Sequence, residues 1–166
     1  MNNDKKLSPL IIEGAHIFFK NFQGKETDYN TAGNRNFCVE IQDEETRNAL
    51  IADGWNVKPT KPRDEEDNPI FYIAVNVSYK IRPPKVVIIQ GNTQTSLTED
   101  TIGSLDWTRT SNVDVKITPS QWAFGGKSGT KGYLASLYAT IEEDDLEKKY
   151  AYLNATNSDD EGLPFK

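Results

Sequence analysis

The chain has 166 residues, which is enough for one domain with a buried core and a short tail. It carries 25 acidic and 19 basic residues, and residues 142–166 hold 8 of the acids and 3 of the bases, so the body is close to neutral. Its single cysteine, Cys38, and single histidine, His16, exclude an intrachain disulfide, a Cys/His metal cluster and any Ser-His nucleophile that does not use His16.

The amino-terminal residues are polar and charged, and no segment approaches 18 consecutive apolar residues. This composition predicts a soluble protein of a reducing compartment, without a membrane partner. We expect a flexible N-terminus over residues 1–9, one domain over 10–153 and an acidic tail over 154–166.

Apolar and polar residues alternate along most of the body, which is the pattern of half-buried β-strands. In the first such segment, Ile17 and Phe19 fall on the inner face, and His16 and Phe18 fall on the outer face. The predicted strands cover residues 10–19, 35–41, 55–58, 70–81, 86–90, 93–97, 113–117 and 133–141.

Two short helices interrupt these strands. Asp43 is a suitable N-cap for a helix that ends at Ala52, and a second, brief helix is expected from Thr98 to about Leu105. Residues 125–131 predict a flexible basic turn. Short strands with long loops and an inserted helix predict a mainly all-β fold, an antiparallel barrel of the oligonucleotide-binding type, with a β-sandwich as the competing architecture.

Basic and aromatic residues interleave in three clusters on the predicted solvent faces. Single-strand binders need this pattern, because cations follow the phosphates while aromatic rings stack on bases of any identity. The alternative is that the rings belong to the core or its rim and the lysines only keep the protein soluble. The candidate ssDNA-binding residues are His16, Phe18, Lys20, Phe22, Lys25, Arg35, Tyr72, Lys80, Arg82, Lys85, Trp122, Lys127 and Lys131.

The sequence contains neither a complete phosphate-binding loop nor a cluster of carboxylates suited to a metal-dependent nuclease. The glycine-rich segment 125–131 lacks the first glycine of a phosphate loop, since Gln121 stands there, and it precedes a strand, not a helix. The carboxylates Glu13, Asp106 and Asp114 are scattered, whereas a two-metal nuclease needs several at one site. We therefore predict a protein that is not an enzyme, with no catalytic residues, metal site or cofactor.

The end of the sequence predicts a disordered peptide ligand, because residues 154–158 are small and polar and cannot bury enough apolar surface to order themselves. The last residues resemble the C-terminal tip of single-stranded DNA-binding proteins, which reads Asp-Asp-Asp-Ile-Pro-Phe in bacteria, except that Lys166 follows the phenylalanine here. The resemblance implies capture of replication or recombination proteins; the alternative is an ordinary solvated acidic terminus. The implied partner-binding residues are Asp159, Asp160, Glu161, Leu163, Pro164 and Phe165.

The body resembles a family of phage-encoded single-stranded DNA-binding proteins over most of residues 10–165. The stretches that carry this resemblance are 14–24, 33–39, 53–58, 82–86 and 139–144. It implies an oligonucleotide-binding barrel that protects single strands, with little base preference, in phage DNA replication or recombination in the cytoplasm of a bacterial host. A homo-oligomer is left open. The alternatives are a phage structural or adaptor β-domain that binds no nucleic acid and a metal-dependent nuclease.

Overall fold

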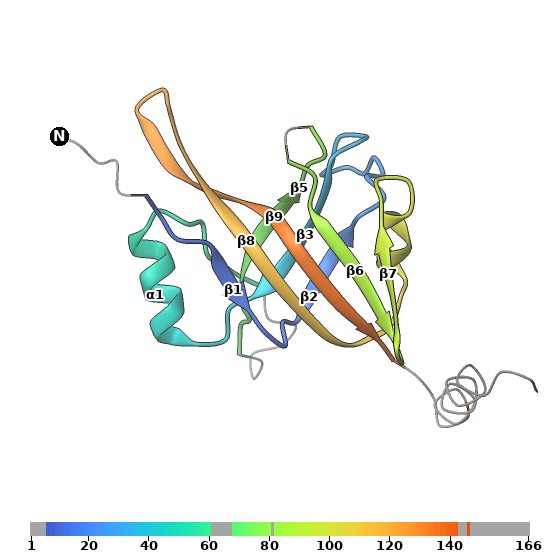
Figure 1. Ribbon diagram of the computed structural model, residues 1–166. Coiled ribbons are helices and arrows are strands. Elements are labelled where there is room, and N and C mark those ends of the chain that lie inside the picture. The colour runs from blue at the N-terminus through green and yellow to red at the C-terminus, as the bar shows by residue number, and fades with distance from the viewer. Residues whose placement is uncertain (1–5, 61–67, 81, 143–145, 147–166) are drawn as a thin grey trace, which may run out of the picture.

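The computed structural model describes residues 6–60, 68–80, 82–142 and 146. A single nine-stranded sheet curls around the core, and one helix lies at one end of it (Figure 1). The strands are β1 (Leu10–Ile12), β2 (Ile17–Asn21), β3 (Arg35–Glu40), β4 (Lys58–Pro59), β5 (Phe71–Val77), β6 (Lys85–Gln90), β7 (Thr93–Leu97), β8 (Thr110–Phe124) and β9 (Lys127–Ile141). The helical segments are α1 (Glu44–Ala52) and the 3-10 helix η1 (Ile102–Asp106). Within the described ranges, no helix is long and apolar enough to span a bilayer.

The long strand β9 organises the sheet, whose main order is β1-β8-β9-β5-β3-β2. One edge of β9 pairs antiparallel with β8, and the other edge pairs in parallel first with β5 and then with β6. The predicted mainly β fold is confirmed, and the two parallel pairings add to the antiparallel arrangement that the sequence predicts. The two ends of the order, β1 and β2, are consecutive in the chain, so the sheet curls back on itself without a ladder between them.

The first predicted strand, residues 10–19, is two strands in the structure. Gly14 takes a φ of 60°, and the next residue, Ala15, donates its N–H to the carbonyl oxygen of Val113 on β8 at 2.7 Å. After this turn the chain leaves β8 and pairs with β3. The alternation changes phase at this turn: Leu10 and Ile12 pack against the core before it and Ile17 packs against the core after it, while Ile11 is 62% exposed. The run of apolar residues at 10–12 hides this change in the sequence.

The core is formed by inward-facing residues of the strands, closed by Leu50 of α1 and by η1. Asp43 caps α1 as predicted, since its Oδ2 accepts the N–H of Thr46 at 3.0 Å. The largest fully buried side chains are Phe22, Phe37, Ile73, Ile102, Ile117, Leu137, Val39, Val75 and Val86.

Several element boundaries differ from the sequence expectation. The predicted flexible turn at 125–131 is only the pair Gly125-Gly126, and β9 begins at Lys127, so β8 and β9 form a hairpin of two 15-residue strands. The predicted strand 55–58 is reduced to β4, and Trp55 before it is buried.

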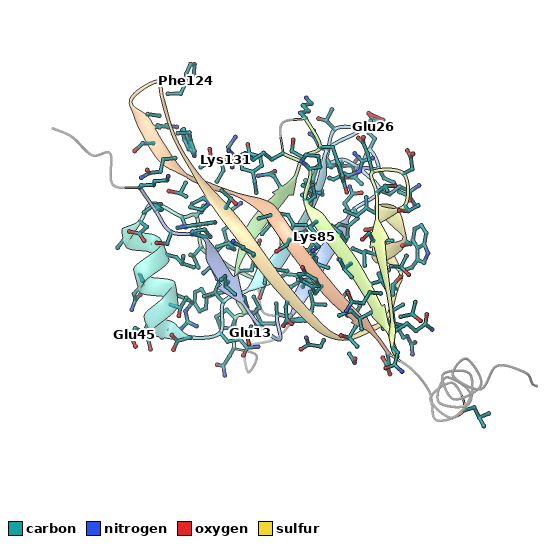
Figure 2. The ribbon with its side chains drawn as sticks, in the orientation of Figure 1. Glu13, Glu26, Glu45, Lys85, Phe124 and Lys131 are labelled. Carbon is teal, nitrogen blue, oxygen red and sulfur yellow. The ribbon has the colours of Figure 1, made fainter. Side chains whose placement is uncertain are left out.

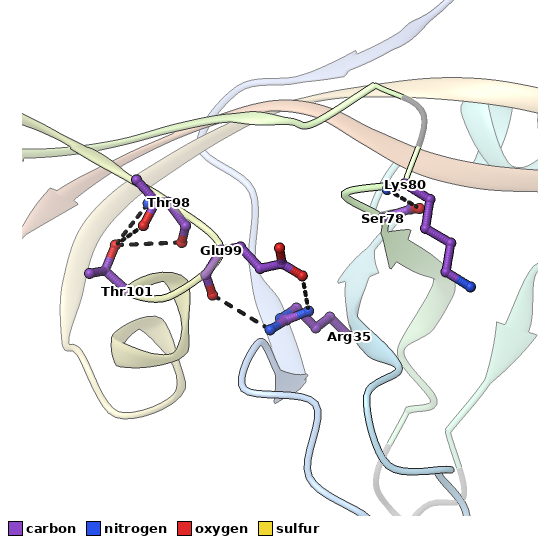
Figure 3. Close-up of polar contacts among 6 residues, drawn as sticks. All are labelled: Arg35, Ser78, Lys80, Thr98, Glu99 and Thr101. Atoms are coloured by element: carbon purple, nitrogen blue, oxygen red, sulfur yellow. Dashed lines mark hydrogen bonds and ion pairs between the residues drawn. The ribbon is translucent and has the colours of Figure 1, made fainter.

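The helix expected from Thr98 is the later 3-10 helix η1, preceded by contacts between Thr98 and Thr101 (Figure 3). The end of the predicted strand 70–81, Ile81, lies outside the described residues.

A close packing contact fixes β9 against β5. Gly132 pairs with Val75 of β5, and a Cβ placed on Gly132 would lie 2.8 Å from both Ile117 Cγ2 and Trp55 Cζ3. Trp55 is 6% exposed, so its ring has little room to move away. Only glycine therefore lets the buried Trp55 ring approach the backbone at this crossing.

We expect Gly132→Ala to lower the free energy of unfolding by about 1–3 kcal/mol, because the added methyl group overpacks the core. Urea denaturation followed by tryptophan fluorescence measures this change. The control is Ser128→Ala, an exposed position on the same strand, which should stay within about 0.5 kcal/mol of the wild type. Equal stability of Gly132→Ala and the wild type would contradict the packing argument.

Candidate nucleic-acid interface

Strands β2, β3 and β5 present one side to the core and the other to solvent. Since Phe37, Val39, Ile73 and Val75 point inward and are buried, the residues between them point outward. We call this solvent side the outer face. It consists of Phe18, Asn36, Cys38, Glu40, Tyr72, Ala74 and Asn76.

Aromatic rings gather at one end of the outer face. The Phe18 centroid lies 5.3 Å from that of Tyr72 and 5.4 Å from that of His16. Phe19 joins them, with its centroid 4.8 Å from Phe18 and 6.1 Å from Tyr72. The sequence predicts His16 and Phe18 on one segment and Tyr72 on another as binding residues, and the structure brings all three together.

One acidic and one basic residue, Glu40 and Lys58, lie beside these rings. Nδ1 of His16 lies 3.0 Å from Oε1 of Glu40, which is the one acidic residue of the outer face as defined. Lys58 stands opposite Tyr72 in the β4–β5 register, on the same side of the sheet. Burial raises the pKa of the Cys38 thiol to about 11, and the positive charge of Lys58 acts in the opposite direction. Lys58 is therefore a cation placed beside Tyr72, at the aromatic end of the outer face.

The β8–β9 hairpin continues this surface away from the body (Figure 1). Tyr133 of β9 pairs with Asn76 of β5, so the outer side of the hairpin adjoins the outer face. Trp122 covers Gly129, where a Cβ would lie 3.0 Å from the indole ring, and Trp122 remains 39% exposed. Lys131 is exposed on β9, and Figure 2 shows Phe124 at the hairpin tip.

Four more of the predicted cations, Lys25, Lys80, Arg82 and Lys127, are exposed. Lys127 pairs with Phe124 next to the Gly125-Gly126 turn, and Lys25 lies in the loop between β2 and β3. Lys80 and Arg82 lie in the connection from β5 to β6, where the Lys80 N–H donates to the Ser78 hydroxyl (Figure 3).

Lys85 extends the basic surface along β9. It lies on β6 (Figure 2) and stands opposite Ser136. Its Nζ lies 5.8 Å from the centroid of the Tyr138 ring. Such a cation–π contact holds the ammonium group near the sheet while leaving it exposed to solvent.

Three predicted binding residues, Phe22, Arg35 and Lys20, make contacts inside the protein and do not lie free on the outer face. Phe22 is 0% exposed and stacks on Phe37 in the core at 5.1 Å, so its assignment as a binding residue is wrong. Arg35 points to the core side of β3, where its guanidinium pairs with Glu99 at 3.3 Å (Figure 3). Lys20 donates its ammonium to the carbonyl oxygen of Leu105 at 2.9 Å and is half-buried. Arg35 and Lys20 thus stabilise loops and η1 in this structure.

Sequence reasoning missed two residues of the interface. Phe19 is expected on the inner face but is 66% exposed, because β2 contains a bulge that alternation cannot reveal. Lys58 sits at the end of a predicted strand whose pairing partner was unknown. Both positions depend on which strand lies alongside, and no local signal in the sequence marks them.

The predicted tail residues 159–161 and 163–165 lie outside the described residues, as do residues 1–5 of the N-terminus. Within the described ranges, no three His, Cys, Asp or Glu side chains are grouped so that they could hold a metal ion.

The chain was compared with protein families, curated proteins and solved structures. A family model described as "Putative phage ssDNA-binding domain" matches residues 1–163. No curated protein matches the chain. A single-stranded DNA-binding protein from bacteriophage Enc34, solved in complex with ssDNA, aligns with a TM-score of 0.54 and 10% identity over 82% of this chain and 88% of that chain.

A second structure of the bacteriophage Enc34 single-stranded DNA-binding protein gives a TM-score of 0.51 and 9% identity, covering 82% of each chain. At these identities the likeness concerns the fold alone. It confirms the predicted oligonucleotide-binding-like fold class, and the residues of the interface must be argued from this chain itself.

The reactivity of Cys38 tests whether its thiol is partly buried on the outer face near Lys58. The thiolate is the reactive form, so a raised pKa lowers the reaction rate. At pH 8 we expect Cys38 to react with iodoacetamide about 10- to 100-fold more slowly than a small free thiol. The rate should keep rising as the pH approaches 11. Lys58→Gln should slow the reaction further, because the Lys58 charge lowers this pKa; a rate that levels off below pH 9 would contradict the assignment.

Proposed function

The chain belongs to the phage ssDNA-binding domain family, and on that premise we propose that it binds single-stranded DNA across its outer face and along the β8–β9 hairpin. One observation carries this proposal: partly or fully exposed aromatic rings and cations share a solvent surface that runs from Phe18 and Tyr72 to Trp122 and Lys131. Rings of this kind stack on unpaired bases, and the cations between them contact phosphates.

Little base preference follows from these residue types. Stacking uses the π-face that every base has, and lysine contacts the phosphate, which carries no sequence information. The bases of a duplex are stacked on one another inside the helix, so the rings can act only on a single strand. We infer a binding protein, not an enzyme, whose role is to protect exposed strands during phage replication or recombination in the host cytoplasm. Self-association remains a prediction.

Salt dependence tests the proposal. We expect affinity for a labelled single-stranded oligonucleotide to fall linearly on a log–log plot as salt rises, because each phosphate contact releases counterions. Lys131→Gln should reduce the slope by about one. The matched control is Lys6→Gln, which removes the same charge beside α1, away from the proposed surface, and should leave the slope unchanged. Fluorescence anisotropy over a salt series gives these slopes.

Equal affinity for duplex and single strand would contradict the proposal, as would affinity that is independent of salt. No binding to either nucleic acid would favour the alternative, a phage structural or adaptor β-domain.

The acidic tail extends the proposal to protein partners. We propose that Phe165, with Leu163 and Pro164, docks into an apolar pocket with a basic rim on a replication or recombination protein. The neighbouring acids compete with DNA phosphates for the cations of the body, a weak and salt-screened effect. Support comes from the sequence of residues 159–165 alone, three acids followed by Gly-Leu-Pro-Phe.

Deleting residues 159–166 should raise ssDNA affinity at low salt, because three competing carboxylates are removed, and should abolish capture of replication proteins. Anisotropy at low and high salt measures the first effect, and pull-down with purified host replication proteins measures the second. Truncation directly after Phe165 is the matched variant, since it places a terminal carboxylate on Phe165 and should strengthen capture. If the deletion changes neither affinity nor capture, the tail is only a solvated terminus.

A further inference from the structure

Phe19 has a backbone conformation that phenylalanine rarely adopts. Its φ is 49°, and within the described ranges it is the one non-glycine residue with a positive φ. In this left-handed region the Cβ of an L-residue crowds the following carbonyl oxygen, so a bulky side chain is strained there. The cause is a β-bulge: β2 advances three residues from Phe18 to Asn21 while β3 advances two.

Burial does not explain why a phenylalanine occupies this position. Phe19 is 66% exposed, whereas the core residues Phe22 and Phe37 are 0% exposed. Glycine or asparagine would take the same φ with little or no strain. A strained backbone that carries an exposed aromatic ring indicates a functional role, because such strain is retained where it positions a contact.

The bulge has a specific effect on side-chain direction. Consecutive residues of a regular strand face opposite sides of a sheet, yet the rings of Phe18 and Phe19 lie on the same side and both contact Tyr72. Their mutual ring angles are 69° to 85°, and the centroids are 4.8 to 6.1 Å apart. Rings this close touch each other edge to face, which leaves no space between them for a cationic group in an aromatic cage.

The open surface is therefore the exposed face of Phe19 itself. A planar ligand that stacks on it would meet the neighbouring ring edges and would lie on the side of the sheet that carries Lys58 opposite Tyr72. Because the backbone and the ring contacts already hold Phe19 in place, little side-chain freedom would be lost on binding.

We propose that Phe19 is a base-stacking residue and that its ligand is an unpaired nucleobase of a single strand. The bulge at Phe18–Phe19 is the device that places a second ring on the outer face. This inference rests on the proposed function and adds a contact residue that alternation along β2 assigns to the core.

The test separates binding from stability in the full-length chain. Phe19→Gly should weaken binding of a mixed-sequence single strand by roughly 5- to 150-fold, the range for loss of one stacking contact. Its thermal midpoint should be no lower than that of the wild type, because glycine takes the positive φ without strain. Phe19→Trp should keep the affinity and add a tryptophan signal that is quenched when DNA binds.

The matched control is Trp107→Ala. Trp107 is 67% exposed, close to the value for Phe19, but it follows η1 with an ordinary φ of −127°. Its loss should leave ssDNA affinity unchanged. Anisotropy titrations and thermal melts of the wild type and the three variants complete the experiment.

Failure of the wild type to bind ssDNA would defeat the proposed function as a whole. If the wild type binds and Phe19→Gly binds equally well, the stacking role of Phe19 is wrong while the proposed function stands. A lower thermal midpoint for Phe19→Gly would assign the ring a structural role and overturn the inference. An equal loss in Trp107→Ala would do the same, since the effect would then belong to exposed rings in general.

Discussion

The approach of Trp55 and Ile117 to Gly132 is the constraint on which the rest of the architecture depends. These side chains occupy the space that a Cβ would need, so β9 must carry a glycine where it passes over them. At that position β9 pairs with β5 through Gly132 and Tyr133. The outer face and the hairpin become one surface because of this pairing, although the paired residues Asn76 and Tyr133 lie 57 positions apart in the chain.

The phenylalanines of β2 and the following loop show how one residue type serves two purposes. Phe22 stacks on Phe37 inside the core, where burial of apolar surface stabilises the fold. Phe18 and Phe19, a few residues earlier, stay on the outer face and contact Tyr72 by their edges. The β-bulge separates the two roles, since it shifts the alternation by one residue between Phe18 and Asn21.

Charge is arranged locally on this protein. The net charge of the chain is −6, so its long-range field repels a polyanion. The outer face instead offers single cations such as Lys58 and Lys131, and its carboxylate at Glu40 is paired with His16. At physiological salt, charges act over about 8 Å. Short-range cations next to stacking rings can therefore bind a single strand even where the overall charge is unfavourable.

Local features of the sequence were sufficient for the elements that depend on neighbouring residues. The alternation of β3 and β5, the tight connection between the predicted strands 86–90 and 93–97 and the Asp43 cap of α1 all appear in the structure, because each is decided within a few residues of the chain. The mainly β class and the presence of aromatic and basic residues on solvent faces followed from the same patterns.

Tertiary structure alone decided the features that need a distant partner. The division of the first strand between β8 and β3, the burial of Phe22, the exposure of Phe19 and the position of Lys58 each depend on which strand lies alongside. The length of the β8–β9 hairpin depends in the same way on a cross-strand register that continues to Lys127. Period-two alternation says that a residue lies on one of two faces, but pairing with residues far away in the chain determines where a bulge shifts that alternation and which face meets the core.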